Sequence, residues 1–92
     1  MPYIDQASRK ILKPALTELL KLVLDPTKFG TRAKAGVLNY IFTILLKNIL
    51  DDDKRYDTAN SLVGALECCK LELYRRYIVP YEDQKILENG DV

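Results

Sequence analysis

Residues 57–79 constrain the fold more than any other stretch, because they read as one long helix that is apolar over most of its circumference. At about 100° per residue, the apolar side chains gather into a broad arc with a centre and an extended flank. The centre consists of Leu62, Ala65, Leu66, Cys69, Leu73 and Tyr77, and the flank of Val63, Leu71, Tyr74 and Ile78. A surface helix has one apolar stripe, so this pattern predicts a helix that is covered on several sides.

Charged residues fall inside this apolar arc. Lys70 lies within the arc and Glu67 on its flank, three residues apart and therefore able to pair, while Arg76 lies at the opposite margin. An unpaired charge among apolar neighbours is very unfavourable. We therefore expect Lys70 to be matched by Glu67, by another subunit or by a ligand, and the pattern leaves all three open.

A second broad helix is predicted over residues 32–50, with Thr31 as its cap. Its apolar residues sweep an arc of about 240°, which leaves a narrow polar strip at Tyr40, Thr43 and Lys47. Helices with so much apolar surface usually lie in a core or between subunits.

The first part of the chain contains two helix-start signals. Asp5 is expected to cap a short turn, and Pro14 to lie in the first turn of a separate helix that ends before Pro26. Residues 26–30 are expected to form a loop. The acidic connector 51–55 should end the second helix, because negative charges there oppose the helix dipole.

The long helix should begin with Asp57 or Thr58 as its cap and stop at Pro80. Residues 80–92 are then predicted to form a short helix or tail that closes at an Asn-Gly pair. This tail is acidic, and its Ile86 and Leu87 give it an apolar side that could dock on a neighbour.

No stretch shows the alternation of a strand, so the predicted fold class is all-α. We expect a single domain over residues 1–92, in which the second and third helices form a hairpin and the shorter first helix packs across it. Of the 92 residues, 48% are hydrophobic. A domain this small buries only about 60% of its unfolded surface. The surplus of apolar residues predicts a homo-oligomer, since obligate subunit interfaces resemble a core cut in half.

The net charge of +1 gives no indication of a DNA, RNA or membrane partner. The distribution is uneven: residues 1–50 carry eight Lys/Arg and three Asp/Glu (+5), and residues 51–92 carry six and ten (−4). This polarity favours head-to-tail or antiparallel packing of subunits, or the steering of anions toward the basic half. Ordinary solvated faces are the simpler explanation.

The chain lacks histidine, which is the commonest general base and metal ligand. It also lacks a phosphate loop, a dinucleotide fingerprint and a nucleophile elbow. We therefore expect no enzymatic activity, no cofactor and no metal. An enzyme that uses Glu, Lys and Tyr alone stays open.

Cys68 and Cys69 cannot bond to each other within a helix, because their side chains diverge by about 100°. The chain has no other cysteine, which fits a reducing compartment. Its start lacks the apolar core of a signal peptide, and the longest apolar run, residues 40–46, is far shorter than the roughly 20 residues of a membrane span. These features predict a soluble, cytoplasmic protein.

An aromatic and guanidinium cluster lies near the end of the long helix, formed by Tyr74, Arg75, Arg76, Tyr77 and Tyr81. Arginines in the last turn of a helix complement its dipole and need no ligand. Alternatively, tyrosine rings stack on bases and arginine forks bind phosphates, as in a nucleotide site.

Three blocks carry a resemblance to a known group of proteins: MPYIDQASRK, LNYIFTILLKNIL and LECCKLELYRRYIVPYEDQKILENGDV. Together they resemble a family of small uncharacterised phage and bacterial proteins that open with Met-Pro-Tyr-Ile and close on a Leu-Glu-Cys-x-Lys-Leu-Glu-x-Tyr-Arg-Arg block. The resemblance implies an all-helical fold and a phage-like context, with the host cell cytoplasm as the location. By analogy of size and helical content, such proteins are similar to phage proteins that sequester cyclic nucleotide immune signals.

The resulting functional hypothesis is an anti-defence protein that binds and sequesters a small anionic, nucleotide-derived signal at subunit interfaces. In this hypothesis Tyr74, Tyr77 and Tyr81 stack on the ligand. Its phosphates are contacted by Lys70, Arg75 and Arg76, and Glu67 positions the site. The alternative is a helical interaction module that binds and blocks a host or phage protein.

Overall fold

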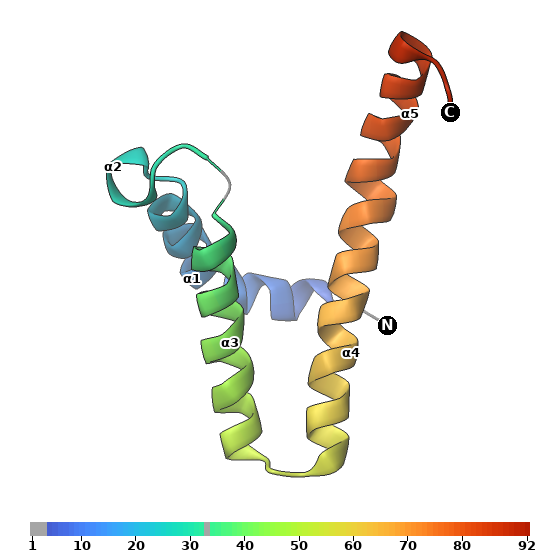
Figure 1. Ribbon diagram of the computed structural model, residues 1–92. Helices are drawn as coiled ribbons and strands as arrows, with labels where there is room; N and C mark the ends of the chain where they lie inside the picture. The colour runs from blue at the N-terminus through green and yellow to red at the C-terminus, as the bar shows by residue number, and fades with distance from the viewer. Residues whose placement is uncertain (1–3, 33) are drawn as a thin grey trace. The chain divides into compact units, whose positions relative to one another are not determined.

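The computed structural model describes residues 4–32 and 34–92, and every regular element in these residues is a helix (Figure 1). The predicted all-α class is confirmed. The chain divides into two compact units, the first ending at Asp53 and the second beginning at Lys54. The predicted hairpin would join helices of different units, so it stays a prediction, as does the single domain.

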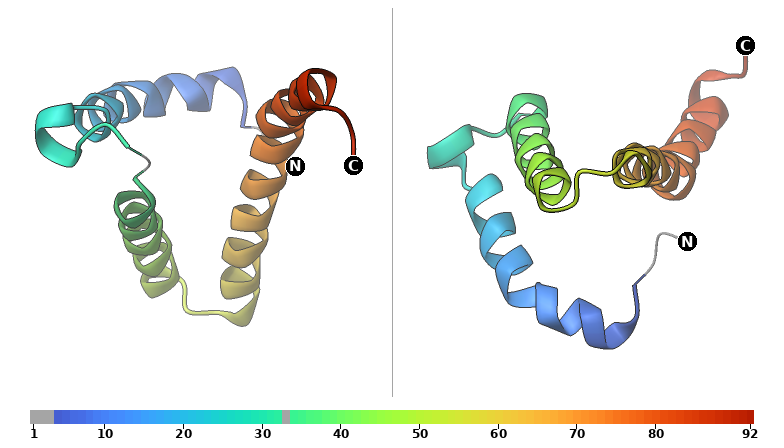
Figure 2. Two further views of the ribbon diagram at one scale, coloured as in Figure 1. Left: turned by 45° about the horizontal axis from the view of Figure 1, so that its top comes forward. Right: turned by 90° about the horizontal axis from the view of Figure 1, so that it is seen from below.

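The first unit begins with α1 (Gln6–Val23). The Asp5 carboxylate accepts a hydrogen bond of 2.8 Å from the Ser8 amide, which confirms Asp5 as the cap. The prediction of a separate helix at Pro14 was wrong, because Pro14 lies inside α1. Proline removes one backbone hydrogen bond and its ring crowds the preceding turn, which bends a helix without always ending it. Figure 2 shows the bend in α1.

The segment expected to be a loop contains a single helical turn, α2 (Pro26–Phe29). The Asp25 carboxylate accepts hydrogen bonds from the Thr27 amide (2.9 Å) and hydroxyl (2.7 Å), and Pro26 supplies a backbone already set for the first turn. Gly30 ends the turn at a φ of 78°, a conformation that favours glycine.

The next helix is α3 (Ala35–Asp52), which starts later and ends later than the sequence predicts. Lys34, not Thr31, occupies the cap position. At the other end, the Lys47 ammonium lies 2.8 Å from the Asp51 carboxylate, one turn along the helix. This ion pair offsets the unfavourable interaction of Asp51 with the helix dipole, so the acidic residues extend α3 instead of ending it.

The second unit is one continuous helical rod, composed of α4 (Tyr56–Leu73), the π-helical turn η1 (Tyr74–Ile78) and α5 (Val79–Asn89) (Figure 1). Arg55 occupies the cap position of α4, so neither predicted cap was correct. Asp57 lies in the first turn, where its charge complements the helix dipole. The rod ends at Gly90, whose φ is 86°, as the Asn-Gly pair predicts.

Pro80 does not stop the helix, contrary to the prediction. In an ordinary α-helix its ring would clash with the carbonyl group four residues earlier. In η1 the backbone widens, and the Val79 amide donates to the Tyr74 carbonyl five residues back. We attribute the continuity of the rod to this wider turn, which accommodates the proline.

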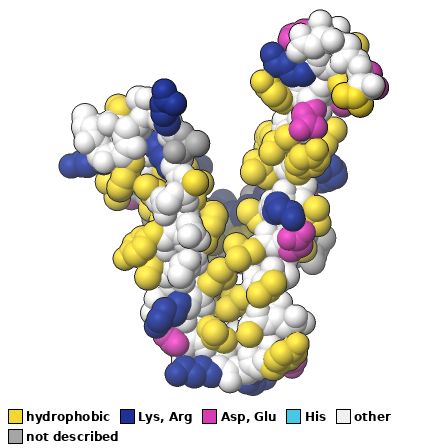
Figure 3. Space-filling view, viewed as in Figure 1, with side chains coloured by type: hydrophobic (Ala, Val, Ile, Leu, Met, Phe, Trp, Pro, Cys, Tyr) yellow, Lys and Arg dark blue, Asp and Glu magenta, His cyan; other side chains and the backbone are white. Residues whose placement is uncertain are grey.

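Neither unit encloses a core of its own, since no described side chain is fully buried. Large apolar side chains lie at the surface of both units (Figure 3). Those on α3 include one stripe spaced by four, three and four residues, which we call the α3 seam: Leu38, Phe42, Leu45 and Ile49, each at least 41% exposed.

Candidate functional site

The structure places all seven predicted site residues on the rod of the second unit. Glu67 and Lys70 lie in α4, Tyr81 lies in α5, and the remaining four lie in η1. The π-turn therefore holds most of the aromatic and guanidinium cluster. Single π-turns within α-helices occur frequently at functional sites, because the extra residue redirects side chains. The four η1 residues are Tyr74, Arg75, Arg76 and Tyr77.

Glu67 and Lys70 form the ion pair that their spacing predicts, with 2.9 Å between the carboxylate and the ammonium. Both side chains are more than half exposed. Exposed pairs of this kind contribute little to stability, so the pair orients two side chains on the surface of α4.

The two arginines of η1 share one carboxylate that sequence reasoning missed. The Glu72 carboxylate lies 2.8 Å from the guanidinium of Arg75 and 3.6 Å from that of Arg76. Glu72 is the least exposed member of this group, with 24% of its side chain accessible. Its spacing of three and four residues from the arginines is the signal that could have identified it. An anionic ligand would have to compete with Glu72 for both guanidinium groups.

A second carboxylate ties η1 to α5. The Tyr74 hydroxyl donates a hydrogen bond of 3.0 Å to Glu82, and this bond to the carboxylate raises the pKa of Tyr74. The two residues are eight apart, whereas ordinary helical neighbours two turns away are seven apart. The bond is therefore a direct consequence of the extra residue in η1, and periodicity alone could not have predicted it.

Two cations lie over tyrosine rings on successive turns of the rod. The Arg76 guanidinium is 5.9 Å from the centre of the Tyr77 ring, and the Lys85 ammonium is 5.5 Å from the centre of the Tyr81 ring. Both distances are within the range of a cation–π attraction. All these residues lie on the outside of a single helix, which has no concave face, so the rod alone provides at most one wall of a ligand site.

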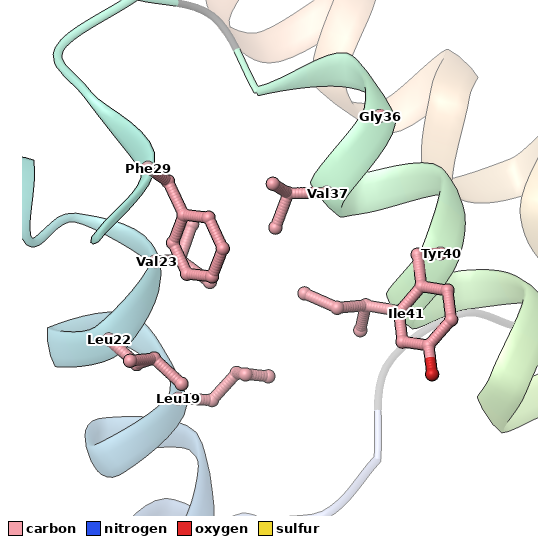
Figure 4. Close-up of a pocket in the computed structure, with 8 residues that line it drawn as sticks. All are labelled: Leu19, Leu22, Val23, Phe29, Gly36, Val37, Tyr40 and Ile41. Atoms are coloured by element: carbon pink, nitrogen blue, oxygen red, sulfur yellow. The ribbon is translucent and has the colours of Figure 1, made fainter.

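The first unit contains an apolar pocket that sequence reasoning missed (Figure 4). It has a volume of about 460 Å³ and is formed where α1, α2 and the start of α3 meet. Phe29 of α2 lines this pocket. Because the sequence predicts a loop at residues 26–30, it does not predict that Phe29 takes part in a pocket. The helical spacing of its other lining residues was the available signal. The pocket is lined by Leu19, Leu22, Val23, Phe29, Gly36, Val37, Tyr40 and Ile41.

The family described as Domain of unknown function (DUF6899) matches residues 1–92. The chain belongs to this family. The match confirms the expectation of a family without an assigned function, while the phage origin and the quoted motif stay predictions. Comparison of this DUF6899 member with curated proteins and with solved structures gave no match.

Residues 4–32 and 34–92 contain no cluster of three His, Cys, Asp or Glu side chains that could hold a metal ion. In the same residues, no helix combines the length and apolarity needed to cross a bilayer. Cys68 and Cys69 are free, exposed thiols.

Proposed function

We propose that this DUF6899 member is a non-enzymatic helical interaction module that self-associates and covers an apolar surface of a host or phage protein. We place this action in the cytoplasm of the host cell. The observation that carries the proposal is the exposure of large apolar side chains on every long helix. Contiguous apolar surfaces of this kind mark protein interaction sites.

The α3 seam is the surface that we assign to the partner protein. Its members recur at alternating spacings of four and three residues, the spacing that allows two helices to interlock side chains. Ile41, which lines the apolar pocket, borders the seam, and Val37 lies further round α3. The seam is therefore centred away from the pocket, although the two surfaces adjoin at Ile41.

The test is affinity capture from host lysate with three forms of the full chain. Leu45→Glu places a charge in the α3 seam, and Thr43→Glu, two residues away on the polar strip, is the matched control. We expect the wild type and Thr43→Glu to retain one stoichiometric protein, and Leu45→Glu to lose it.

Two outcomes would contradict this proposal. The first is equal capture, or no capture, by all three forms. The second is a Leu45→Glu variant that loses helical circular dichroism in isolation, because the seam would then be occupied by a helix of the same chain.

A second candidate function is sequestration of a small anionic, nucleotide-derived signal at a subunit interface. The observation that favours it is the pair of cation-capped rings, Arg76 over Tyr77 and Lys85 over Tyr81, which combine aromatic faces with positive charge. In this function Tyr74 and Arg75 extend the site within η1, and Glu67 and Lys70 flank it in α4.

Calorimetry with cyclic dinucleotides, cyclic trinucleotides and cyclic ADP-ribose isomers tests this second candidate. We expect one ligand class to bind, to be recovered chemically unchanged, and to lose at least tenfold in affinity with Tyr77→Ala but not with Tyr56→Ala. Absence of binding across the panel rejects the candidate, and recovery of an altered ligand would instead identify an enzyme.

A further inference from the structure

The rod of the second unit carries an apolar seam from Leu62 to Tyr81, which we call the rod seam. In α4 it passes through Leu62, Leu66, Cys69 and Leu73, with spacings of four, three and four residues. If the α-helix continued unchanged, the next positions would be Arg76 and Pro80. The extra residue in η1 shifts the seam by one position, so that it continues through Tyr77 and Tyr81 instead.

The hydrogen bond between Tyr74 and Glu82 supports this shift of register, because it joins residues eight apart on one face. Leu73, Tyr77 and Tyr81 are 53%, 64% and 62% exposed. A seam of large apolar side chains on both sides of η1 is thus available for another helix.

A second rod matches the rod seam in length. The seam runs from Leu62 to Tyr81, which is 20 residues or about 30 Å of helix. A second copy of the chain presents a seam of the same length with the same side chains, so two copies can match along all of it.

The charges of the rod set the direction of such a pair. Residues 54–76 carry five Lys/Arg and three Asp/Glu (+2), and residues 77–92 carry one lysine and four acids (−3). An antiparallel pair places the basic part of each rod against the acidic part of the other. A parallel pair would place like charges together, which is unfavourable.

We propose that two copies of this chain associate through their rod seams as an antiparallel helix pair with two-fold symmetry. Leu62 lies opposite Tyr81, and Leu66 lies opposite Tyr77. This register brings Arg76 of one copy next to Glu67 of the other. The pairing does not depend on which protein the α3 seam binds, and it supplies a second wall for the aromatic and guanidinium cluster.

Sedimentation equilibrium of the full chain tests the pairing, with Leu73→Glu as the seam variant and Leu71→Glu as the matched control. Leu71 is 56% exposed, close to the 53% of Leu73, but it lies outside the seam. We expect the wild type and Leu71→Glu to sediment at twice the 10.6 kDa of one chain. Leu73→Glu should weaken association at least tenfold. A wild type that stays monomeric, or equal effects of the two variants, would overturn the proposal.

The direction of the pair is tested with a spin label at Asp57→Cys in a chain that also carries Cys68→Ser and Cys69→Ala, the second of which keeps the seam apolar. The antiparallel register separates the two labels by about 43 Å along the axis, whereas a parallel pair places them side by side. A short distance between the labels would reject the antiparallel arrangement.

If circular dichroism shows that Leu73→Glu does not fold, Leu66→Ala replaces it as the seam variant in the sedimentation experiment. The criterion stays a tenfold weaker association.

Discussion

Several carboxylates in this protein accept hydrogen bonds that complete helix starts or join successive turns. Asp5 accepts the Ser8 amide, and Asp25 accepts the Thr27 hydroxyl and then the Thr27 amide. These bonds hold the pKa of both carboxyls below the usual range. Glu82 accepts from Tyr74 in the rod. Local polar contacts thus determine where helices begin and how η1 connects to α5.

At the residue scale, the first prediction concerns Tyr74. The Tyr74 hydroxyl donates a hydrogen bond to the Glu82 carboxylate, which raises the pKa of Tyr74. This hydrogen bond is therefore present below the usual phenol pKa near 10, and it is lost as the pH rises through the raised pKa of Tyr74. In an ultraviolet alkaline titration, Tyr74→Phe should remove an ionisation step that lies above the usual phenol pKa. Tyr77→Phe is the control variant, and the step should persist in it.

The second prediction at this scale concerns the cap of α2. Since the pKa of Asp25 is lowered, its stabilising effect is complete above the usual value near 3.9 and is lost as the pH falls below it. Amide exchange at Thr27 should accelerate, relative to intrinsic rates, as the pH falls below about 4. Asp25→Asn, which keeps a capping oxygen without the charge, should show no such transition. A Thr27 amide whose protection does not change through this range would contradict the assignment.

At the element scale, η1 and Pro80 depend on each other. The wider turn accommodates the proline, and the proline disfavours a return to regular α-helical hydrogen bonding. The position of η1 also decides which side chains share a face with the seam of α4. A change at Pro80 should therefore alter side chains on both sides of the turn.

We predict that Pro80→Ala converts η1 toward regular α-helix and raises the free energy of unfolding, by at most the roughly 3 kcal/mol that proline costs inside a helix. The register would shift by one residue and separate Tyr74 from Glu82. The Tyr74 phenol should then ionise at lower pH than in the wild type. Urea unfolding and alkaline titration of the same variant measure the two effects. An unchanged Tyr74 titration would show that η1 does not depend on the proline.

At the scale of the whole molecule, the main feature is that no side chain among residues 4–32 and 34–92 is fully buried, although large apolar side chains are abundant. Burial of apolar surface is the dominant stabilising contribution to a fold. Stability should therefore depend on association, as it does in obligate oligomers whose monomers are not independently stable.

The corresponding prediction is that the midpoint of thermal unfolding rises with protein concentration, because dissociation accompanies unfolding. Circular dichroism over a hundredfold range of concentration measures this effect. Leu73→Glu should lower the midpoint and reduce its dependence on concentration, whereas Leu71→Glu should behave as the wild type. A midpoint independent of concentration in the wild type would indicate that each chain is stabilised by its own contacts.

Local patterns in the sequence were sufficient to predict the all-α class, the long apolar helices, the cap at Asp5 and the end of the rod at Gly90, and they gave Glu67 as one of three possible partners of Lys70. Each of these depends on residues within about one turn, where spacing and side-chain chemistry decide the outcome. The same reasoning failed at Pro14 and Pro80, because whether proline ends a helix or only reshapes it depends on backbone hydrogen bonds of the surrounding turns.

The apolar pocket and the register across η1 were decided by the three-dimensional structure alone. The pocket requires Phe29 of α2 to meet residues from two other helices, and helical spacing within each segment does not show that the segments meet. The shift that joins Tyr74 to Glu82 arises from one extra residue in a turn, which no helical wheel of constant pitch can represent. The long apolar helix at residues 57–79 was evident from its sequence, but the continuation of its seam beyond Pro80 became visible only in the structure.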